Sequence, residues 1–284
     1  MVDLLIIGAG PAGVSAAIYA KRLGISVKIL YSGESNLEKA SQIDNYYGFE
    51  NGISGKELYD KGVIQAKNLG IDVDNEEVFN IGKENDLFFA ETEKERYISK
   101  AVIIATGNKK IRPDIEGLVD YEGKGISYCA ICDGFFYKNK NVVVIGDGKY
   151  AINEANNLKN VAESVTILTN DENTIENSEF EVVAKKINKI FGENKVQGIE
   201  FQDGEKMYVD GVFIAVGEAG GTDFARNLGI ALEKDSIVVN EDMQTNIEGL
   251  FACGNAVGGL LQVCKSTYEG AKAGLSAANY VMNK

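Results

Sequence analysis

The chain has 284 residues, a formal net charge of −13 and no histidine. This acidity argues against nucleic acid, whose binding needs a concentrated basic surface, and against an anionic membrane. The lack of imidazole excludes mechanisms with a histidine base and the common zinc-hydrolase sites, and we expect no metal site. The sequence shows neither a secretory leader nor an apolar run of membrane-spanning length, so we expect a cytoplasmic protein.

The first predicted unit is a strand, a glycine-rich turn, a helix and a second strand. The strands are expected at Leu4–Ile7 and Val27–Leu30, and the helix at Val14–Leu23. The turn, Gly8–Gly13, follows the G-x-G-x-x-G pattern. Glycines there allow a tight turn, close backbone approach to a pyrophosphate and packing of the helix on the strand. The alternative, a glycine turn without a ligand, is less favoured in this context.

A second unit of the same kind follows. Strands are expected at Val142–Ile145 and Val165–Leu168, with a helix at Ile152–Leu158 between them. The turn Gly146–Ala151 joins the first strand to this helix, and a further helix is expected around Val183–Ile190. Two such units predict an α/β fold with two nucleotide-type domains.

The C-x-x-C-D block carries the strongest chemical signal. Cys129 and Cys132 are spaced to close a small disulfide, and this spacing lowers thiol pKa values. Asp133 follows and could hold or supply a proton. Half of a structural zinc site is the rival interpretation, but the other cysteines, Cys253 and Cys264, lie eleven residues apart. Those two could form a second redox pair, although free cysteines are usually buried hydrophobic residues, as we expect here.

Together these motifs resemble the low-molecular-weight thioredoxin reductases over essentially the whole chain. The C-A-x-C-D-G block is specific to that family, whereas the other matching stretches are shared more widely among flavoproteins. The resemblance implies FAD as cofactor, thioredoxin as substrate and a homodimer. It implies two Rossmann-like, three-layer domains, with a FAD-binding domain at 1–113 and 244–284. The second domain, 114–243, is inserted and carries the cysteine pair. The matching stretches are Gly8–Gly13, Ile43–Phe49, Ala105–Gly107, Gly125–Phe136 and Gly249–Asn255.

The resemblance also implies roles for individual residues. Cys129, Cys132 and Asp133 would be catalytic, with Cys132 nearer the flavin. Asn45 would approach the flavin, and Asn255, which stands where the family normally has Asp, would bind the ribityl chain. The residues expected to bind FAD are Gly8, Gly10, Ala12, Gly13, Asn45, Ala105, Thr106, Gly107, Gly254, Asn255, Gln262 and Val263.

One departure from the family concerns the electron donor. Members that use NADPH carry a His-Arg-Arg cluster after the second strand of the inserted domain, and its arginines hold the 2'-phosphate. The matching stretch here is Leu168–Glu172, and no basic residue occurs from 166 to 183. Two lost charge-assisted bonds are worth roughly 3–6 kcal/mol, or about two to four decades of affinity.

A change from NADPH to NADH would be an alternative, but three features oppose it. Asp147 lies in the second glycine turn, Tyr150 stands where a small hydroxyl residue is usual, and the stretch after Thr169 is short. This pattern resembles the ferredoxin-dependent flavin thioredoxin reductases. A plant-type ferredoxin has a reduction potential of about −400 mV and can reduce a thioredoxin at about −270 mV. The gap corresponds to roughly 6 kcal/mol for two electrons.

Other functions stay open. The chain could be an NAD(P)H-dependent thioredoxin reductase, or a non-catalytic flavin redox sensor, although the intact cysteine block argues against the latter. Two basic runs could dock an acidic protein, but ordinary solvated turns are the favoured interpretation. These runs are Lys109, Lys110 and Arg112, and Lys138 and Lys140.

Overall fold

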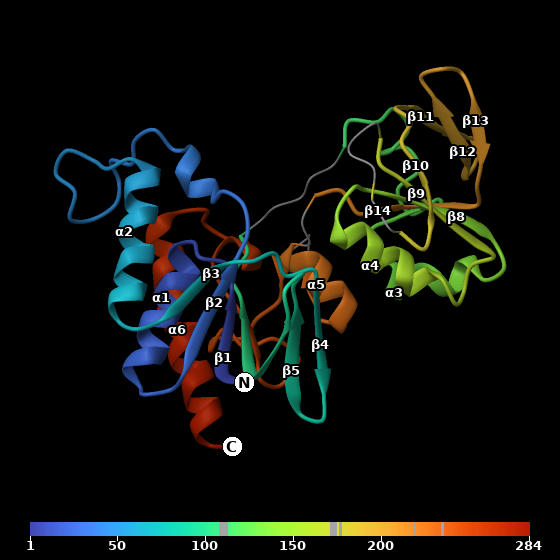
Figure 1. Ribbon diagram of the computed structural model, residues 1–284. Coiled ribbons are helices and arrows are strands. Elements are labelled where there is room, and N and C mark those ends of the chain that lie inside the picture. Colours follow the sequence, from blue (N-terminus) through green and yellow to red (C-terminus); the bar gives the residue numbers. More distant parts are fainter. Residues whose placement is uncertain (108–112, 171–174, 176–177, 218–219, 234–235) are drawn as a thin grey trace. The chain divides into compact units, whose positions relative to one another are not determined.

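The chain forms two compact units, one of them inserted in the other (Figure 1). The computed structural model describes residues 1–107, 113–170, 175, 178–217, 220–233 and 236–284. The first unit joins 1–109 to 220–284, and the second comprises 110–219. Both are α/β units, as the paired glycine motifs predicted. The basic run Lys109, Lys110 and Arg112 lies outside the described residues, as do Asp171 and Glu172.

The first unit is built on a seven-stranded sheet. Five strands run parallel: β1 (Val2–Ile7), β2 (Val27–Tyr31), β3 (Asp72–Asn75), β6 (Arg96–Ile104) and β17 (Leu250–Ala252). The strands β4 (Asn80–Glu84) and β5 (Leu87–Glu91) extend the sheet as an antiparallel meander. The first half of β6 pairs with β5 and its last three residues pair with β17. The buried apolar ends of β1 and β6 therefore form the centre of the sheet.

Two long helices of this unit, α1 (Pro11–Arg22) and α6 (Val263–Met282), pack closely together (Figure 1). Small residues allow this approach. A Cβ atom at Gly270 or Gly274 would lie 2.1 or 2.2 Å from a carbonyl oxygen of α1. Further helical segments of this unit are η1 (Asn36–Lys39), α2 (Gly55–Asn68) and η3 (Gly254–Val257).

The segment that returns from the second unit packs with the first. It contains α5 (Gly221–Leu228) and the hairpin β15 (Leu232–Glu233) and β16 (Ser236–Ile237). Here α5 packs against β4, and β16 packs against η3. A Cβ at Gly221 would lie 2.8 Å from Thr106 Oγ1, which shows how tightly α5 is seated. We expected the inserted domain to extend to residue 243, whereas the compact second unit ends at 219.

The second unit contains two sheets. The first is parallel, with strand order β10-β9-β8-β14-β7, and the second is an antiparallel meander of β11, β12 and β13. The parallel strands are β7 (Ile126–Ser127), β8 (Asn141–Ile145), β9 (Ser164–Leu168), β10 (Glu181–Val183) and β14 (Gly211–Ile214). The meander comprises β11 (Ile187–Gly192), β12 (Val196–Phe201) and β13 (Lys206–Tyr208). The helical segments are α3 (Ala130–Asp133), η2 (Gly134–Tyr137) and α4 (Lys149–Leu158).

The prediction of a helix around Val183–Ile190 is wrong, because Val183 is the last residue of β10 and β11 begins at Ile187. Val183 pairs with Leu168 of β9, and Ile190 pairs with Ile199 of β12. β-Branched side chains fit such half-buried pleated surfaces. Among the described residues, none of the helices is both long and apolar enough to cross a bilayer.

Candidate functional site

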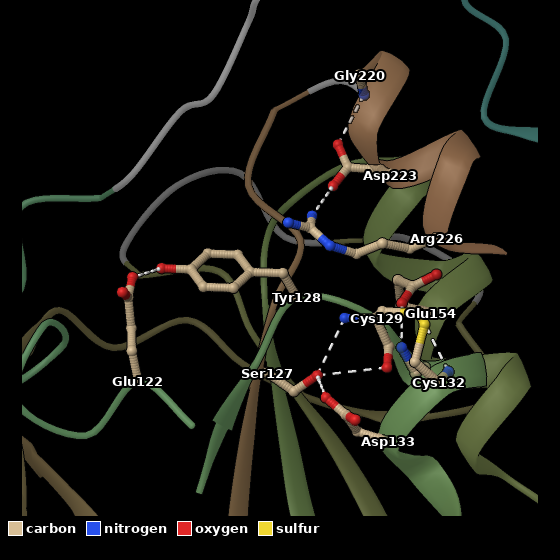
Figure 2. Close-up of polar contacts among 11 residues, drawn as sticks. Glu122, Ser127, Tyr128, Cys129, Cys132, Asp133, Glu154, Gly220, Asp223 and Arg226 are labelled. Atoms are coloured by element: carbon tan, nitrogen blue, oxygen red, sulfur yellow. Dashed lines mark hydrogen bonds and ion pairs between the residues drawn. A yellow bond between two sulfur atoms is a disulfide. The ribbon is translucent and has the colours of Figure 1, made fainter. Parts of the chain in front are cut away.

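Cys129 and Cys132 are joined by a disulfide at the start of α3 (Figure 2). Cys129 directly precedes the helix and is only 2% exposed, whereas Cys132 is exposed. The backbone N–H of Cys132 donates a hydrogen bond to Cys129 Sγ at 3.0 Å. Such a donor favours the thiolate over the thiol. The local backbone therefore prepares Cys129 to carry negative charge after reduction.

Ser127 fixes the carboxylate of Asp133 beside this pair (Figure 2). The Ser127 hydroxyl donates to Asp133 Oδ2 at 2.7 Å, and its oxygen accepts from the backbone N–H of Cys129 at 3.1 Å. The backbone N–H of Asp133 also donates to the carbonyl of Cys129 at 3.1 Å. The predicted catalytic triplet is thus brought together, with a hydroxyl that the sequence analysis did not single out.

A buried carboxylate supports the same helix from α4. Glu154 is 1% exposed, and its Oε2 accepts from the backbone N–H of Ala130 at 2.7 Å (Figure 2). The sequence analysis did not identify it. The one available signal was a charged residue on the helix face that also carries the buried residues Ala151, Ala155 and Leu158.

In the first unit, three parallel strands end at one edge of the sheet. Because β1, β6 and β17 pair in register, the turns that follow them lie side by side. Gly8 has a φ of +113°, and a Cβ there would lie 2.3 Å from the carbonyl oxygen of Ala105. A Cβ at Gly13 would lie 1.9 Å from the carbonyl oxygen of Gly8, so the α1 helix can pack here only with glycine. A Cβ at Gly254 would lie 2.7 Å from the Ala12 side chain.

The start of α1 at this edge has no side-chain cap. Gly10 is the N-cap residue, Pro11 begins the helix, and the described part of the chain provides no side-chain cap for it. Uncapped N–H groups and the positive end of a twelve-residue helix favour an anionic ligand. Thr106 and Gly107 follow Ala105 in the neighbouring turn.

Two asparagines complete the predicted set. Asn45 Nδ2 donates to Gln262 Oε1 at 2.9 Å, which joins residues 217 positions apart and places Asn45 beside the start of α6 at Val263. Asn255 lies in η3 and its Oδ1 atom is buried without a hydrogen-bond partner among the described residues. A buried acceptor without a partner is costly in a folded protein, and a ligand hydroxyl would satisfy it.

Comparison with known proteins decides the family. Residues 2–274 match the family model described as pyridine nucleotide-disulphide oxidoreductase. The thioredoxin reductase of Listeria monocytogenes is 33% identical over 300 aligned residues, which cover 98% of this chain and 93% of the relative. The chain belongs to the thioredoxin reductases within this oxidoreductase family.

Two solved structures are similar over full length. The atypical thioredoxin reductase TRi from Desulfovibrio vulgaris Hildenborough has a TM-score of 0.91 and 36% identity, with 100% of this chain and 99% of that chain covered. A ferredoxin-flavin thioredoxin reductase from Clostridium acetobutylicum has a TM-score of 0.71 and 34% identity, with the same coverage. This reductase is accordingly a flavoprotein oxidoreductase whose cofactor is FAD. The uncapped helix α1 and the unsatisfied Asn255 Oδ1 fit that cofactor.

The second glycine turn of the reductase differs from the first. A Cβ at Gly146 would lie 2.1 Å from the carbonyl oxygen of Ala215, the residue that follows β14. The turn therefore still approaches the end of this strand closely. Asp147 is exposed at the tip of the turn, however, and Tyr150 is 3% exposed in the first turn of α4. The tyrosine ring is thus packed into the interior of the unit. Lys149, between them in the sequence, is exposed.

The remaining cysteines of the reductase do not bond to each other. Cys253 is fully buried, as expected, and burial raises the pKa of its thiol. The prediction that Cys264 is buried is wrong, because this residue is exposed in the first turn of α6. Within the ranges that the structure describes, no group of three or more acidic or cysteine side chains could hold a metal ion.

The lysines after the cysteine block are not equivalent. Lys138 is exposed, whereas Lys140 turns back on its own segment. The Lys140 ammonium donates to the carbonyl of Phe136 at 2.9 Å and lies 5.6 Å from the ring centroid of Tyr137. These contacts agree with the favoured interpretation of an ordinary turn.

Proposed function

We propose that this thioredoxin reductase takes its electrons from a ferredoxin. FAD would pass them to Cys129 and Cys132, and the pair would reduce the disulfide of thioredoxin. The observation that carries the donor assignment is the second glycine turn, with Asp147 exposed at its tip and Tyr150 buried. A pyrophosphate at this turn would meet the negative charge of Asp147, at a helix start where Tyr150 replaces a small hydroxyl residue.

The carboxyl edge of the first sheet is the proposed FAD site. The N–H groups at the start of α1 would hold the pyrophosphate, and Asn255 would accept a hydrogen bond from a ribityl hydroxyl. Asn45, held by Gln262, would lie at the flavin. FAD supplies the conversion of single electrons into a pair. The proposed contacts are Gly8, Gly10, Ala12, Gly13, Asn45, Ala105, Thr106, Gly107, Gly254, Asn255, Gln262 and Val263.

The chemistry of the pair follows from its hydrogen bonds. In the reduced enzyme, the Cys129 thiolate, stabilised by the N–H of Cys132, attacks one sulfur of the thioredoxin disulfide. Cys132 then attacks Cys129 Sγ in the mixed disulfide, which restores the intramolecular disulfide and releases thioredoxin as a dithiol. Asp133, oriented by Ser127, takes the proton that Cys129 loses as its thiolate forms and gives it to the departing thiolate of thioredoxin. The proton that Cys132 loses in the second step goes to the other thioredoxin sulfur.

The name of one structural relative supports this donor. One structural relative is by its name a ferredoxin-flavin thioredoxin reductase, and the potentials of ferredoxin and thioredoxin permit the reaction. The alternative, an NAD(P)H-dependent thioredoxin reductase, is favoured by the exposed Lys149 beside the turn, a cation that could meet a phosphate. We also propose that the enzyme is a cytoplasmic homodimer.

A donor comparison tests the proposal. Purified holoenzyme is mixed anaerobically with millimolar NADPH, with NADH or with reduced ferredoxin, and flavin absorbance and thioredoxin reduction are recorded. We expect the nicotinamides to leave the flavin oxidised and ferredoxin to support turnover. Dithionite is the control, because it should bleach the flavin, which added oxidised thioredoxin then reoxidises. Rapid bleaching by either nicotinamide at micromolar concentration would contradict the proposal and return the enzyme to the NAD(P)H-dependent type.

A further inference from the structure

A lysine of α6 reaches across to the turn that carries Asn255. The Lys265 ammonium donates to the carbonyl of Gly254 at 2.8 Å, and it donates also to the carbonyl of Gly258. Its side chain is 14% exposed. An ammonium has three donors, so these two carbonyls leave one more to be satisfied.

Glu269, one helical turn further on, completes the arrangement. Its Oε2 lies 2.9 Å from the Lys265 ammonium and accepts from the backbone N–H of Gly254 at 3.0 Å. The Glu269 side chain is 13% exposed. Withdrawing two charges from water is costly unless each finds hydrogen-bond partners, and here each does. We call Lys265 and Glu269 the α6 ion pair.

The α6 ion pair therefore holds both backbone polar groups of Gly254. This residue has a φ of +72°, and it abuts the Ala12 side chain of α1. Asn255, with its unsatisfied buried Oδ1, is the next residue in the chain. We propose that Lys265 and Glu269 are positioning residues for FAD: they fix the turn so that Asn255 faces the ribityl chain. This proposal depends on FAD as cofactor and not on the identity of the electron donor.

The charges of the pair give the proposal a distinctive signature. Together they are neutral, but removal of one leaves a largely buried charge next to the cofactor site. Reduction adds negative charge to the flavin. A lone Glu269 carboxylate should therefore make the flavin midpoint potential more negative, and a lone Lys265 ammonium should make it more positive. A merely structural role would not shift the potential in opposite directions.

The test uses the full chain with Lys265→Met, Glu269→Gln and the double variant. Lys272→Met is the matched control, because it removes a lysine from the same helix two turns further on. FAD affinity of the apoprotein is measured by fluorescence titration, the flavin midpoint potential by spectroelectrochemistry, and the stability of the apoprotein by thermal unfolding. Lys265→Arg, which keeps the cation, replaces Lys265→Met if that variant does not fold.

We expect Lys265→Met to weaken FAD binding roughly 10- to 100-fold, and Glu269→Gln less, because an amide oxygen can still accept from Gly254. The potential should fall in the first variant and rise in the second, and the double variant should lie near the wild type. With Lys265→Arg, affinity and potential should stay close to the wild type. Wild-type FAD affinity in Lys265→Met or Glu269→Gln, potentials that shift in the same direction, or loss of FAD binding with Lys265→Arg would overturn the proposal.

Discussion

At the scale of single residues, the two sulfurs of the reductase have different surroundings. Cys129 is buried and accepts from the N–H of Cys132, whereas Cys132 is exposed in the oxidised chain. Thiolate stabilisation points to Cys129 as the nucleophile, while exposure alone would point to Cys132. The hydrogen bond is the better guide, because the attacking sulfur must be ionised. The exposure of a sulfur in the oxidised chain, in contrast, can change when thioredoxin binds.

Serine substitutions test this assignment. Cys129→Ser and Cys132→Ser should each lose disulfide turnover by at least about a thousandfold and keep FAD, because the proposed cofactor residues lie in the other unit. Only Cys132→Ser, which retains Cys129, should form a stable mixed disulfide with thioredoxin, as measured by intact mass spectrometry. Cys264→Ser is the control and should react like the wild type. A stable adduct formed by Cys129→Ser instead would make Cys132 the nucleophile.

The residues that could be predicted from sequence are those in contiguous motifs. Cys129, Asp133 and the first glycine turn carry their chemistry in local spacing. Glu154 and Lys265 could not be predicted, because each acts through a backbone group that the fold brings to it from another element. The positions of these two residues in the sequence do not indicate which backbone group each one contacts.

At the scale of elements, the side chain of Asp3 forms hydrogen bonds that link β1 to β6 and to the residue before β2. Asp3 of β1 accepts from the ammonium of Lys100 in β6 at 2.7 Å. It also accepts from the backbone N–H and hydroxyl of Ser26, just before β2, at 2.9 and 2.7 Å. The hydrogen bond from Lys100, with those from Ser26, lowers the pKa of Asp3 from 3.8 to about 2. The carboxylate therefore stabilises the folded state only while it is ionised.

Asp3→Asn should lower the free energy of unfolding by on the order of 1 kcal/mol at pH 7, a modest value because the group is partly solvated. A lowered pKa contributes stability above the unfolded value and loses it as the pH falls through the folded value. The difference from wild type should therefore shrink between about pH 4 and about pH 2, as measured by urea unfolding. Asp60→Asn, which breaks an exposed i,i+4 pair with Lys56, should change little at any pH. A pH-independent deficit in Asp3→Asn would refute this account.

Element prediction succeeded where strand, turn and helix follow in immediate sequence. It failed at 183–190, where the pattern of apolar residues fits either a helix or a strand. Long-range pairing with β9 and β12 decides that segment, and no local feature reports it. The domain boundary after residue 219 is of the same kind, because it depends on the packing of α5 against β4.

At the scale of the whole molecule, each unit has a hydrophobic core of its own. The first core includes Leu4, Ile29 and Phe251, and the second includes Val143, Ile199 and Phe201. All the proposed FAD contacts belong to the first unit, and the disulfide belongs to the second. Ligand binding stabilises the part of a protein that it holds together. FAD and the Cys129–Cys132 disulfide should therefore stabilise different parts of the chain.

Hydrogen exchange followed by mass spectrometry can separate these effects. At FAD concentrations about 100 times its Kd, backbone amides in β1, β6 and α6 should gain up to about 2.7 kcal/mol of protection over the apoprotein. Amides in β8, β9 and β14 should change little. Conversely, reduction of the disulfide should lower protection in the second unit by on the order of 2 kcal/mol at most, since the closed loop is very short. Lys272→Met should repeat the wild-type pattern. If FAD protected both units equally, they would unfold as one cooperative body, because the ligand would then stabilise residues that it does not contact.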